Sequence, residues 1–372
     1  MPPNDDIPAG LSLRDDRVVP ADIAAALGRA SGRSGFGVDV AETLDWVVET
    51  LPFDHDPPAL RDGWMLLAAT AATSVGAARI LEPHLDALRI LAEAEASGRA
   101  IDLAALDVSA ASTWGVFAAE GAGMRLRADE TADGWRLNGT KPWCSLASHL
   151  SHALVTAWVD DDQRRLFAID LRSPSASART GPWHARGLPQ IVSAPLDLDG
   201  APAVPVGETG WYLRRAGFAH GGIGVAACWW GGATALLHPL RAGAARDGAD
   251  QLARVHLGRA DTALWAARAV LAAAADGIER GDIERGDVDH SAAEHGDVAA
   301  PAVLAARVRA AVADAVELTL REAEHALGPL PLVADEAHAR RVADLQLYVR
   351  QHHGDRDVAR IGADIAQGRG AW

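Results

Sequence analysis

The spacing of apolar residues divides the chain into three parts. From about residue 20 to 106 the sequence is rich in Ala and Leu and poor in β-branched residues, which is typical of helices. From 111 to 209 apolar and polar residues alternate, and Asp133-Gly134 marks a turn between two strands. From residue 210 long Ala-rich stretches return. The pattern therefore predicts an α+β protein in which a strand-rich middle part separates two helical parts.

Three details qualify the helical parts. We expect the stretch "GWMLLAATAATSVGAARILEPHL" to break at Glu82-Pro83, because proline disfavours helical backbone in the residue before it. "GGIGVA" (221–226) fits a loose nucleotide-binding fingerprint, but the sequence before it is a poor strand. Its small residues favour instead the close approach of two helices. The charged repeat within about 277–300 predicts a surface loop.

These observations give a division of the chain into four segments. The expected segments are a flexible N-terminus (1–18), an N-terminal α-helical domain (19–110), a middle β-domain (111–209) and a C-terminal α-helical domain (210–372).

Composition and charge exclude several classes of function. The 372 residues carry 35 basic and 50 acidic side chains, a net charge of −15, which disfavours binding to nucleic acid or to an anionic membrane. No apolar run is long enough to predict a membrane span, and the acidic start of the chain does not resemble a signal peptide. Only Cys144 and Cys228 are present, which suits a reducing cytoplasm. No metal-binding spacing occurs, so we expect no metal site.

The segment "NGTKPWCS" (138–145) carries the first chemical signal. A flat indole offers stacking area, and a hydroxyl two residues later can donate or accept a hydrogen bond. At the start of a strand in an α–β–α chain, this segment resembles the flavin-contacting strand of the acyl-CoA dehydrogenase superfamily. The resemblance implies a middle β-barrel or sandwich and a C-terminal four-helix bundle. It also implies that Trp143 packs on the flavin ring and that Ser145 hydrogen-bonds near flavin N5.

Other segments extend the resemblance over roughly residues 65–365. "WGVFAAEGAG" lies where the family has a second flavin-contacting strand, so backbone groups of Phe117 to Ala119 are expected to contact the flavin. Arg241 lies near the family's pyrophosphate-binding arginine, but the Phe-Gly that should follow it is missing. His325 and Gly328 match a segment that, in the family, reaches the flavin from a neighbouring subunit. The resemblance therefore implies a homodimer or homotetramer.

The family's catalytic glutamate is absent. Its two known positions fall on His352, in "RQHHGDRD", and approximately on His220. Histidine can act as a general base because its ordinary pKa lies near neutrality. We therefore expect one of His352, His353 and His220 to take the substrate proton, with a solvated or packed helix end as the alternative for the adjacent pair.

Three functions remain open from the sequence. The first is a cytoplasmic, FAD-dependent oxidoreductase that passes hydride from an acyl-thioester-like or other small substrate to flavin N5. The second is a two-component monooxygenase that uses reduced flavin, FAD or FMN, and O2. The third is a flavin-binding scaffold without catalysis. An electron-transfer or flavin-reductase partner accompanies the first two.

Overall fold

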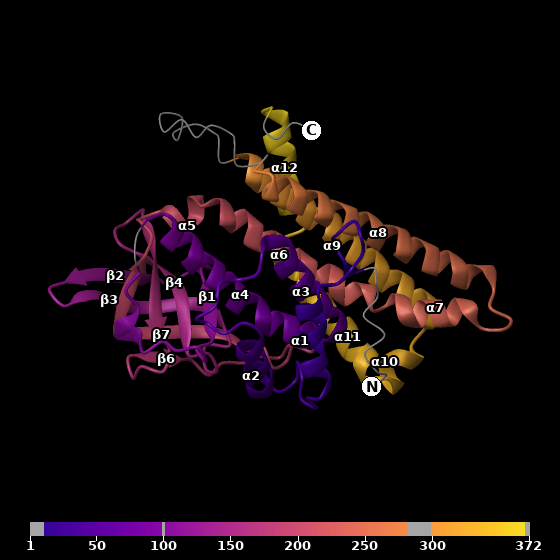
Figure 1. The fold of residues 1–372 in the computed structure, drawn as a ribbon, viewed down its shortest axis with the longest axis horizontal. Helices are drawn as coiled ribbons and strands as arrows, with labels where there is room; N and C mark the ends of the chain where they lie inside the picture. Colours follow the sequence, from indigo (N-terminus) through magenta and orange to yellow (C-terminus); the bar gives the residue numbers. More distant parts are fainter. Residues whose placement is uncertain (1–10, 99–100, 282–298, 369–372) are drawn as a thin grey trace.

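A computed structural model describes residues 11–98, 101–281 and 299–368. It has the expected α+β composition, with the strands gathered at one end and the helices beside and behind them (Figure 1). The N-terminal helices are α1 (Ala21–Ser31), α2 (Val40–Thr50), α3 (Leu60–Thr73) and α4 (Val75–Ala96), followed by a short 3-10 turn at Ala104–Leu106.

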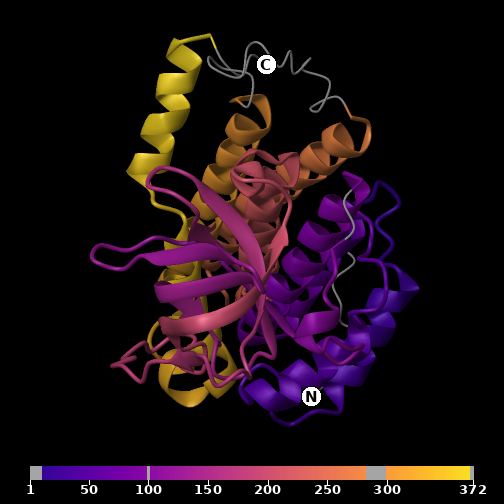
Figure 2. The same cartoon turned by 90° about the vertical axis from the view of Figure 1, so that its left-hand side faces the viewer.

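The strands form one curved sheet that closes on itself (Figure 2). They are β1 (Trp114–Phe117), β2 (Leu126–Thr131), β3 (Gly134–Ser145), β4 (His152–Trp158), β5 (Arg164–Asp170), β6 (Ala176–Ala178) and β7 (Ser193–Val206). Hydrogen-bonded pairs run β4-β2-β3-β7-β5 and return from β5 to β4, while β1 lies parallel to β4 and β6 adds to β7. Closure leaves few free strand edges, as in a small barrel.

The chain then returns to helices. They are α5 (Trp211–Arg214), α6 (Ala216–Thr234), α7 (Leu237–Ala245), α8 (Gln251–Glu279), α9 (Ala299–Leu327), α10 (Leu330–Ala334), α11 (Glu336–Tyr348), a 3-10 turn at Val349–Gln351, and α12 (Asp355–Ala366). Helix α9 packs on both α6 and α8, and α6 also packs on α3 and α4 from the first half of the chain. The two helical parts therefore share one core.

The expected helix break at Glu82-Pro83 is wrong. Helix α4 runs through Pro83, and the break falls at Ser74, whose side chain accepts a hydrogen bond from the backbone N–H of Ala77. This N-cap provides a partner for a free donor at the new helix start. Pro83 is buried, so packing of its ring offsets the backbone hydrogen bond that it cannot make.

The small residues of α6 allow the close helix contact that we expected. A Cβ atom added to Gly231 would lie 2.1 Å from the carbonyl oxygen of Ala68 on α3, and one added to Gly224 would lie 3.5 Å from the indole of Trp64. The segment before these glycines is helix α5, not a strand. The nucleotide fingerprint is therefore excluded, and the glycines serve helix packing.

Two of the expected segments lie partly outside the described residues. Residues 1–10, and most of the loop expected at about 277–300, lie outside them. Within the stretch 1–18, Leu11 and Leu13 are buried in the core, and Arg268 of α8 donates hydrogen bonds to the backbone carbonyls of Ser12 and Arg14. The flexible N-terminus stays a prediction. The domain limits and the four-helix bundle stay predictions.

None of the helices in the described ranges has both the length and the apolar character that a membrane crossing requires.

Candidate functional site

Trp143 stands out on the barrel surface. The register between β3 and β7 shifts between Lys141 and Cys144, and Trp143 within this bulge has φ +59°. Such backbone is uncommon for a bulky residue, and bulges often re-aim a side chain beside a functional site. The indole is 61% exposed. Trp143 is therefore not a core residue.

An ion pair between the buried Lys141 and the partly exposed Glu120 anchors the strand that carries Trp143. The Lys141 side chain is only 1% exposed, and its Nζ donates to Glu120 Oε1 at 2.6 Å and to Thr156 Oγ1 at 2.8 Å. Burial lowers the pKa of Lys141, while Glu120 opposes that change. The lysine of "GTKPWCS" thus has a structural role.

The segment after β1 lies against the same bulge. A Cβ atom added to Gly121 would lie 3.1 Å from the ring of Pro142, next to Trp143. The Phe117 side chain is buried, whereas Ala119 is exposed. The structure thus brings the Phe117–Ala119 backbone and Trp143 to one region of the barrel, and the flavin contacts expected there stay predictions.

Arg79 connects this region to the helices. Its guanidinium donates to Ser145 Oγ at 3.1 Å and to Glu82 Oε2 at 3.2 Å. Ser145 Oγ also lies 2.6 Å from Ser193 Oγ, and the Arg79 guanidinium carbon lies 5.8 Å from the centre of the Tyr348 ring. The hydroxyl expected beside flavin N5 is therefore held by a half-buried cation.

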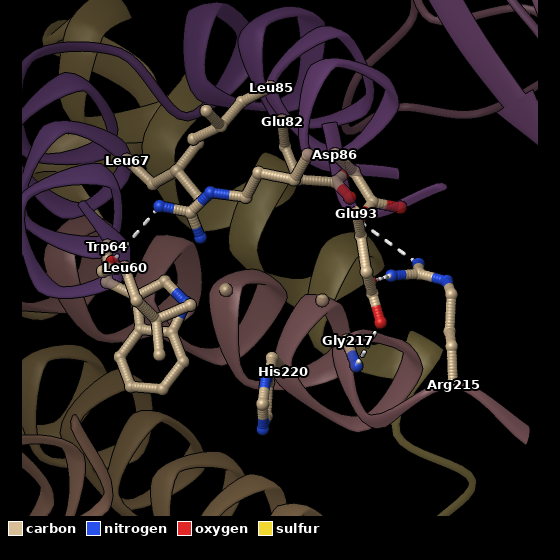
Figure 3. A pocket seen from close by; sticks show the side chains of 13 residues that line it. Leu60, Trp64, Leu67, Glu82, Leu85, Asp86, Glu93, Arg215, Gly217 and His220 are labelled. Atoms are coloured by element: carbon tan, nitrogen blue, oxygen red, sulfur yellow. Dashed lines mark hydrogen bonds and ion pairs between the residues drawn. The ribbon is translucent and has the colours of Figure 1, made fainter. Parts of the chain in front are cut away.

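A cavity of about 120 Å³ lies between α3, α4 and the start of α6 (Figure 3). Charged side chains line it to an unusual degree for a space between helices: Glu82, Asp86, Arg89, Glu93 and Arg215. Buried charges are normally paired or hydrogen-bonded, since removing them from water is costly. Such a lining suits a polar ligand.

Of the three candidate histidines, only His220 lines this cavity. Burial lowers its pKa, so the ring is neutral at pH 7, and its Nε2 has no partner among the described residues. A neutral, unpartnered imidazole nitrogen at a cavity wall can accept a proton.

The histidine pair lies elsewhere, after α11. His352 is buried with its Nδ1 3.3 Å from Asp357 Oδ2, and burial lowers its pKa. The His353 side chain is 64% exposed and lies 3.4 Å from the same carboxylate. Arg309 joins the two regions, since it donates to the carbonyls of Gly222 and Gln351. The pair is therefore linked through Arg309 to the helix that carries His220, but neither histidine lines the cavity.

Three expected flavin-binding residues lie far from Trp143. Arg241 is exposed on α7, His325 is exposed near the end of α9, and Gly328 follows α9 with φ +65°. Figure 1 places α7 at the opposite end of the molecule from the strands. Within one chain these residues are not brought to the Trp143 region, so a flavin contact from them needs a second subunit.

Arg79, Glu82, Asp86 and Arg215 are site residues that sequence reasoning missed. The signal was present in α4, where charges recur at 79, 82, 86, 89 and 93. Residues three or four apart lie on one face of a helix. In an otherwise apolar, buried helix, such a charged face indicates a polar cavity rather than solvent.

The raised pKa of Glu82 gives a prediction for stability. Burial raises this pKa from 4.5 to about 7. The folded chain then holds the proton more tightly than the unfolded chain, so the contribution to stability is full below pH 4.5 and is lost as the pH rises through 7. In the wild type, Glu82 makes the free energy of unfolding lower at pH 8 than at pH 5. In Glu82→Gln this loss between pH 5 and pH 8 should be smaller than in the wild type by about 2 kcal/mol. Urea unfolding at both pH values measures it, and an unchanged difference contradicts the assignment.

Both cysteines are buried and free. Burial raises the pKa of Cys144 to about 12, and that of Cys228 is also raised by burial. The described residues contain no group of three or more His, Cys, Asp or Glu side chains placed to hold a metal ion.

Comparison with known proteins locates the fold. No family model matches the sequence, and no curated protein matches it. Solved structures do match. A complex of KijD3 with FMN and dTDP-3-amino-2,3,6-trideoxy-4-keto-3-methyl-D-glucose has 18% identity, TM-score 0.73, and coverage of 97% of this chain and 94% of that one. FMN-bound TdsC from Paenibacillus sp. A11-2 has 15% identity, TM-score 0.76, and coverage of 95% and 98%.

A third match is butyryl-CoA dehydrogenase from Megasphaera elsdenii, with 16% identity, TM-score 0.71, and coverage of 94% of this chain and 99% of that one. At these identities the likeness defines the fold and not the reaction. The resemblance inferred from the sequence is thereby confirmed at the level of architecture: over nearly its whole length, the chain has the acyl-CoA dehydrogenase fold.

Proposed function

We propose that the protein is a flavin-dependent oxidoreductase. The observation that carries the proposal is Trp143, a large indole exposed by a strained bulge, with the Ser145 hydroxyl and the Arg79 guanidinium beside it. An exposed aromatic face provides a stacking surface, and a hydroxyl held by a cation provides a polar contact at a ring edge. These residues fit an isoalloxazine ring.

The bound flavin would supply two-electron redox chemistry, which no side chain of the site can supply. KijD3 and TdsC, whose folds match this chain, were each solved with FMN. FMN and FAD share the isoalloxazine ring that Trp143 would contact, so both are candidates. Arg241, His325 and Gly328 would contact the remainder of the flavin from a second subunit, which calls for a homodimer or homotetramer.

Within this function, His220 is our choice for the group that moves the substrate proton. It lines the cavity, and its Nε2 is unpartnered. His352 Nδ1 also lacks a hydrogen-bond partner, but it lies 3.3 Å from Asp357 Oδ2, and neither His352 nor His353 lines the cavity. His352 is the alternative, because Arg309 ties its segment to that of His220.

The charged cavity favours one of the two reactions. Burying an acyl chain against Glu82, Asp86 and Arg89 would remove their hydration without replacing it. We therefore favour oxidation of a polar molecule with reduced flavin and O2, supplied by a flavin-reductase partner, over hydride removal from an acyl thioester. Product that forms only with O2 and reduced flavin would support this choice. Product formed without O2, with an artificial electron acceptor, would support the thioester reaction and an electron-transfer partner.

Trp143→Ala tests flavin binding directly. Loss of one stacking face should weaken binding of FMN or FAD by about 10-fold to 100-fold, since stacking on an aromatic side chain contributes about 1–3 kcal/mol. Titration of the flavin fluorescence measures the change. Trp265→Ala is the matched control, because Trp265 on α8 is 60% exposed and outside the site. Equal flavin affinity in the wild type, Trp143→Ala and Trp265→Ala would contradict the proposal, and so would a wild type that binds no flavin.

A further inference from the structure

We propose that the cavity between α3, α4 and α6 selects a small substrate that carries both a protonated amine and an oxygen acceptor, and that Asp86 binds the amine. This inference rests on the proposed function, because it treats the cavity as the substrate site of the oxidoreductase.

Two charged groups of the cavity, Asp86 and Arg89, have no hydrogen-bonded partner of opposite charge among the described residues. Glu93 accepts from Arg215 at 2.6 Å, and Glu82 accepts from Arg79 at 3.2 Å. Arg89 donates to the backbone carbonyls of residues 58–60, at the start of α3, rather than to a carboxylate. The positive charges of the site are therefore already engaged by other partners.

Asp86 is left without a hydrogen-bond donor among the described residues. Its nearest cation is Arg215, with 3.9 Å between Asp86 Oδ1 and the guanidinium nitrogen, beyond hydrogen-bond distance. Its side chain is 19% exposed, so little water replaces that donor. A carboxylate in this position can accept charge-assisted hydrogen bonds from an ammonium group. Burial raises the pKa of Asp86, and a bound cation would act against that change.

Three other residues that line the cavity each have a nitrogen atom without a hydrogen-bond partner among the described residues. Trp64 is fully buried, and its Nε1 has no hydrogen-bond partner; the same holds for Nε of Arg215, whose side chain is 2% exposed, and for His220 Nε2. The indole and guanidinium N–H groups can only donate. Unpaired buried donors are costly, so they call for an oxygen acceptor on the ligand.

The absence of a side chain at Gly221 on α6 leaves room for the Asp86 carboxylate. A Cβ atom added to Gly221 would lie 2.8 Å from Asp86 Oδ1. Figure 3 shows Asp86, Glu93 and Arg215 on one side of the cavity and Trp64 on the other, with His220 on the helix that forms its floor. The Asp86 acceptor and the Trp64 donor are thus on different walls, and Arg215 Nε lies on the Asp86 side. A ligand with an amine at one end and an oxygen at the other can satisfy both Asp86 and Trp64. An anionic ligand of the same size would instead face Asp86 and Glu82.

Binding of three probes of one ring size tests the inference. The probes are trans-4-aminocyclohexanol, cyclohexane-1,4-diol and 4-hydroxycyclohexanecarboxylate, titrated calorimetrically into the flavin-loaded full-length protein. We expect the amine to bind at least about 10-fold more tightly than the diol, which is the change for one charge-assisted hydrogen bond, and the carboxylate to bind most weakly. Equal binding of amine and diol overturns the inference and needs no variant.

Asp86→Asn assigns the effect to one residue. It should lose the preference for the amine and change diol binding by less than about 3-fold, whereas Asp247→Asn, an exposed aspartate after α7, should leave all three affinities unchanged. An amine preference that survives in folded Asp86→Asn overturns the role of Asp86. Flavin titration separates the two proposals. If the wild-type protein binds flavin but shows no preference for the amine, the inference alone is wrong. If the wild-type protein binds no flavin, the proposed function is wrong.

Discussion

Replacing His220 with glutamine is expected to lower substrate turnover by about 10²-fold to 10⁴-fold, the usual contribution of a general base. The ring lines the cavity and carries an unpartnered nitrogen, and burial keeps its pKa below the ordinary value. Glutamine keeps a polar side chain of similar size but cannot take the proton. The saturating rate of product formation measures the loss, and flavin affinity should be unchanged because His220 is on the cavity side of the site.

The other two histidines provide the comparison. His353→Gln should retain wild-type turnover, since that ring is exposed. His352→Gln decides between the two buried candidates. If His352→Gln abolishes turnover while His220→Gln retains it, the base is His352 and the assignment to His220 is wrong.

Replacing Glu120 with alanine is expected to lower the free energy of unfolding by about 3–5 kcal/mol, the usual loss when a buried charge is left unpaired. Lys141, which is 1% exposed, would keep only the hydroxyl of Thr156 as a hydrogen-bond partner. Urea unfolding followed by circular dichroism measures the change. Because the "GTKPWCS" strand depends on this pair, the variant should also bind flavin more weakly.

Replacing Lys141 instead of Glu120 should lower the free energy of unfolding by less. In Lys141→Met, Glu120 keeps Arg164 at 3.1 Å and the indole of Trp158, and its side chain is 32% exposed. The double variant Glu120→Ala/Lys141→Met contains no unpaired buried charge, so it should be more stable than Glu120→Ala alone. Glu336→Ala, which removes an exposed ion pair with Arg340 on α11, is the control and should change stability by less than about 1 kcal/mol. Equal losses for Glu120→Ala and Glu336→Ala contradict a special role for the pair of Lys141 and Glu120.

Local patterns in the sequence were sufficient for the fold class. Alternation around Asp133-Gly134 predicts strands, and β2 and β3 meet at that turn. The proline at 83 misled the analysis, because its local preference is outweighed by burial of the ring within α4. The true break at Ser74 depends on one side-chain cap in an otherwise continuous apolar stretch.

The site was predictable only in part. Trp143 and Ser145 could be named as candidates because they lie two residues apart in one strand and carry the resemblance, and their flavin contacts stay predictions. Arg79 and Asp86 were missed because their importance depends on which face of α4 is buried, and that is decided by helices distant in sequence. The choice among the histidines likewise required the cavity, since spacing along the chain favoured His352.

The burial of both thiols has a practical consequence. Oxidants and maleimide reagents attack accessible thiolates, and Cys144 and Cys228 offer neither access nor thiolate at neutral pH. Hydrogen peroxide released by reduced flavin in air should therefore spare them. A single cysteine introduced on the surface could be tagged selectively in the otherwise native chain. Spectroscopy on the tagged protein would then test the proposed homo-oligomer without first removing the natural thiols.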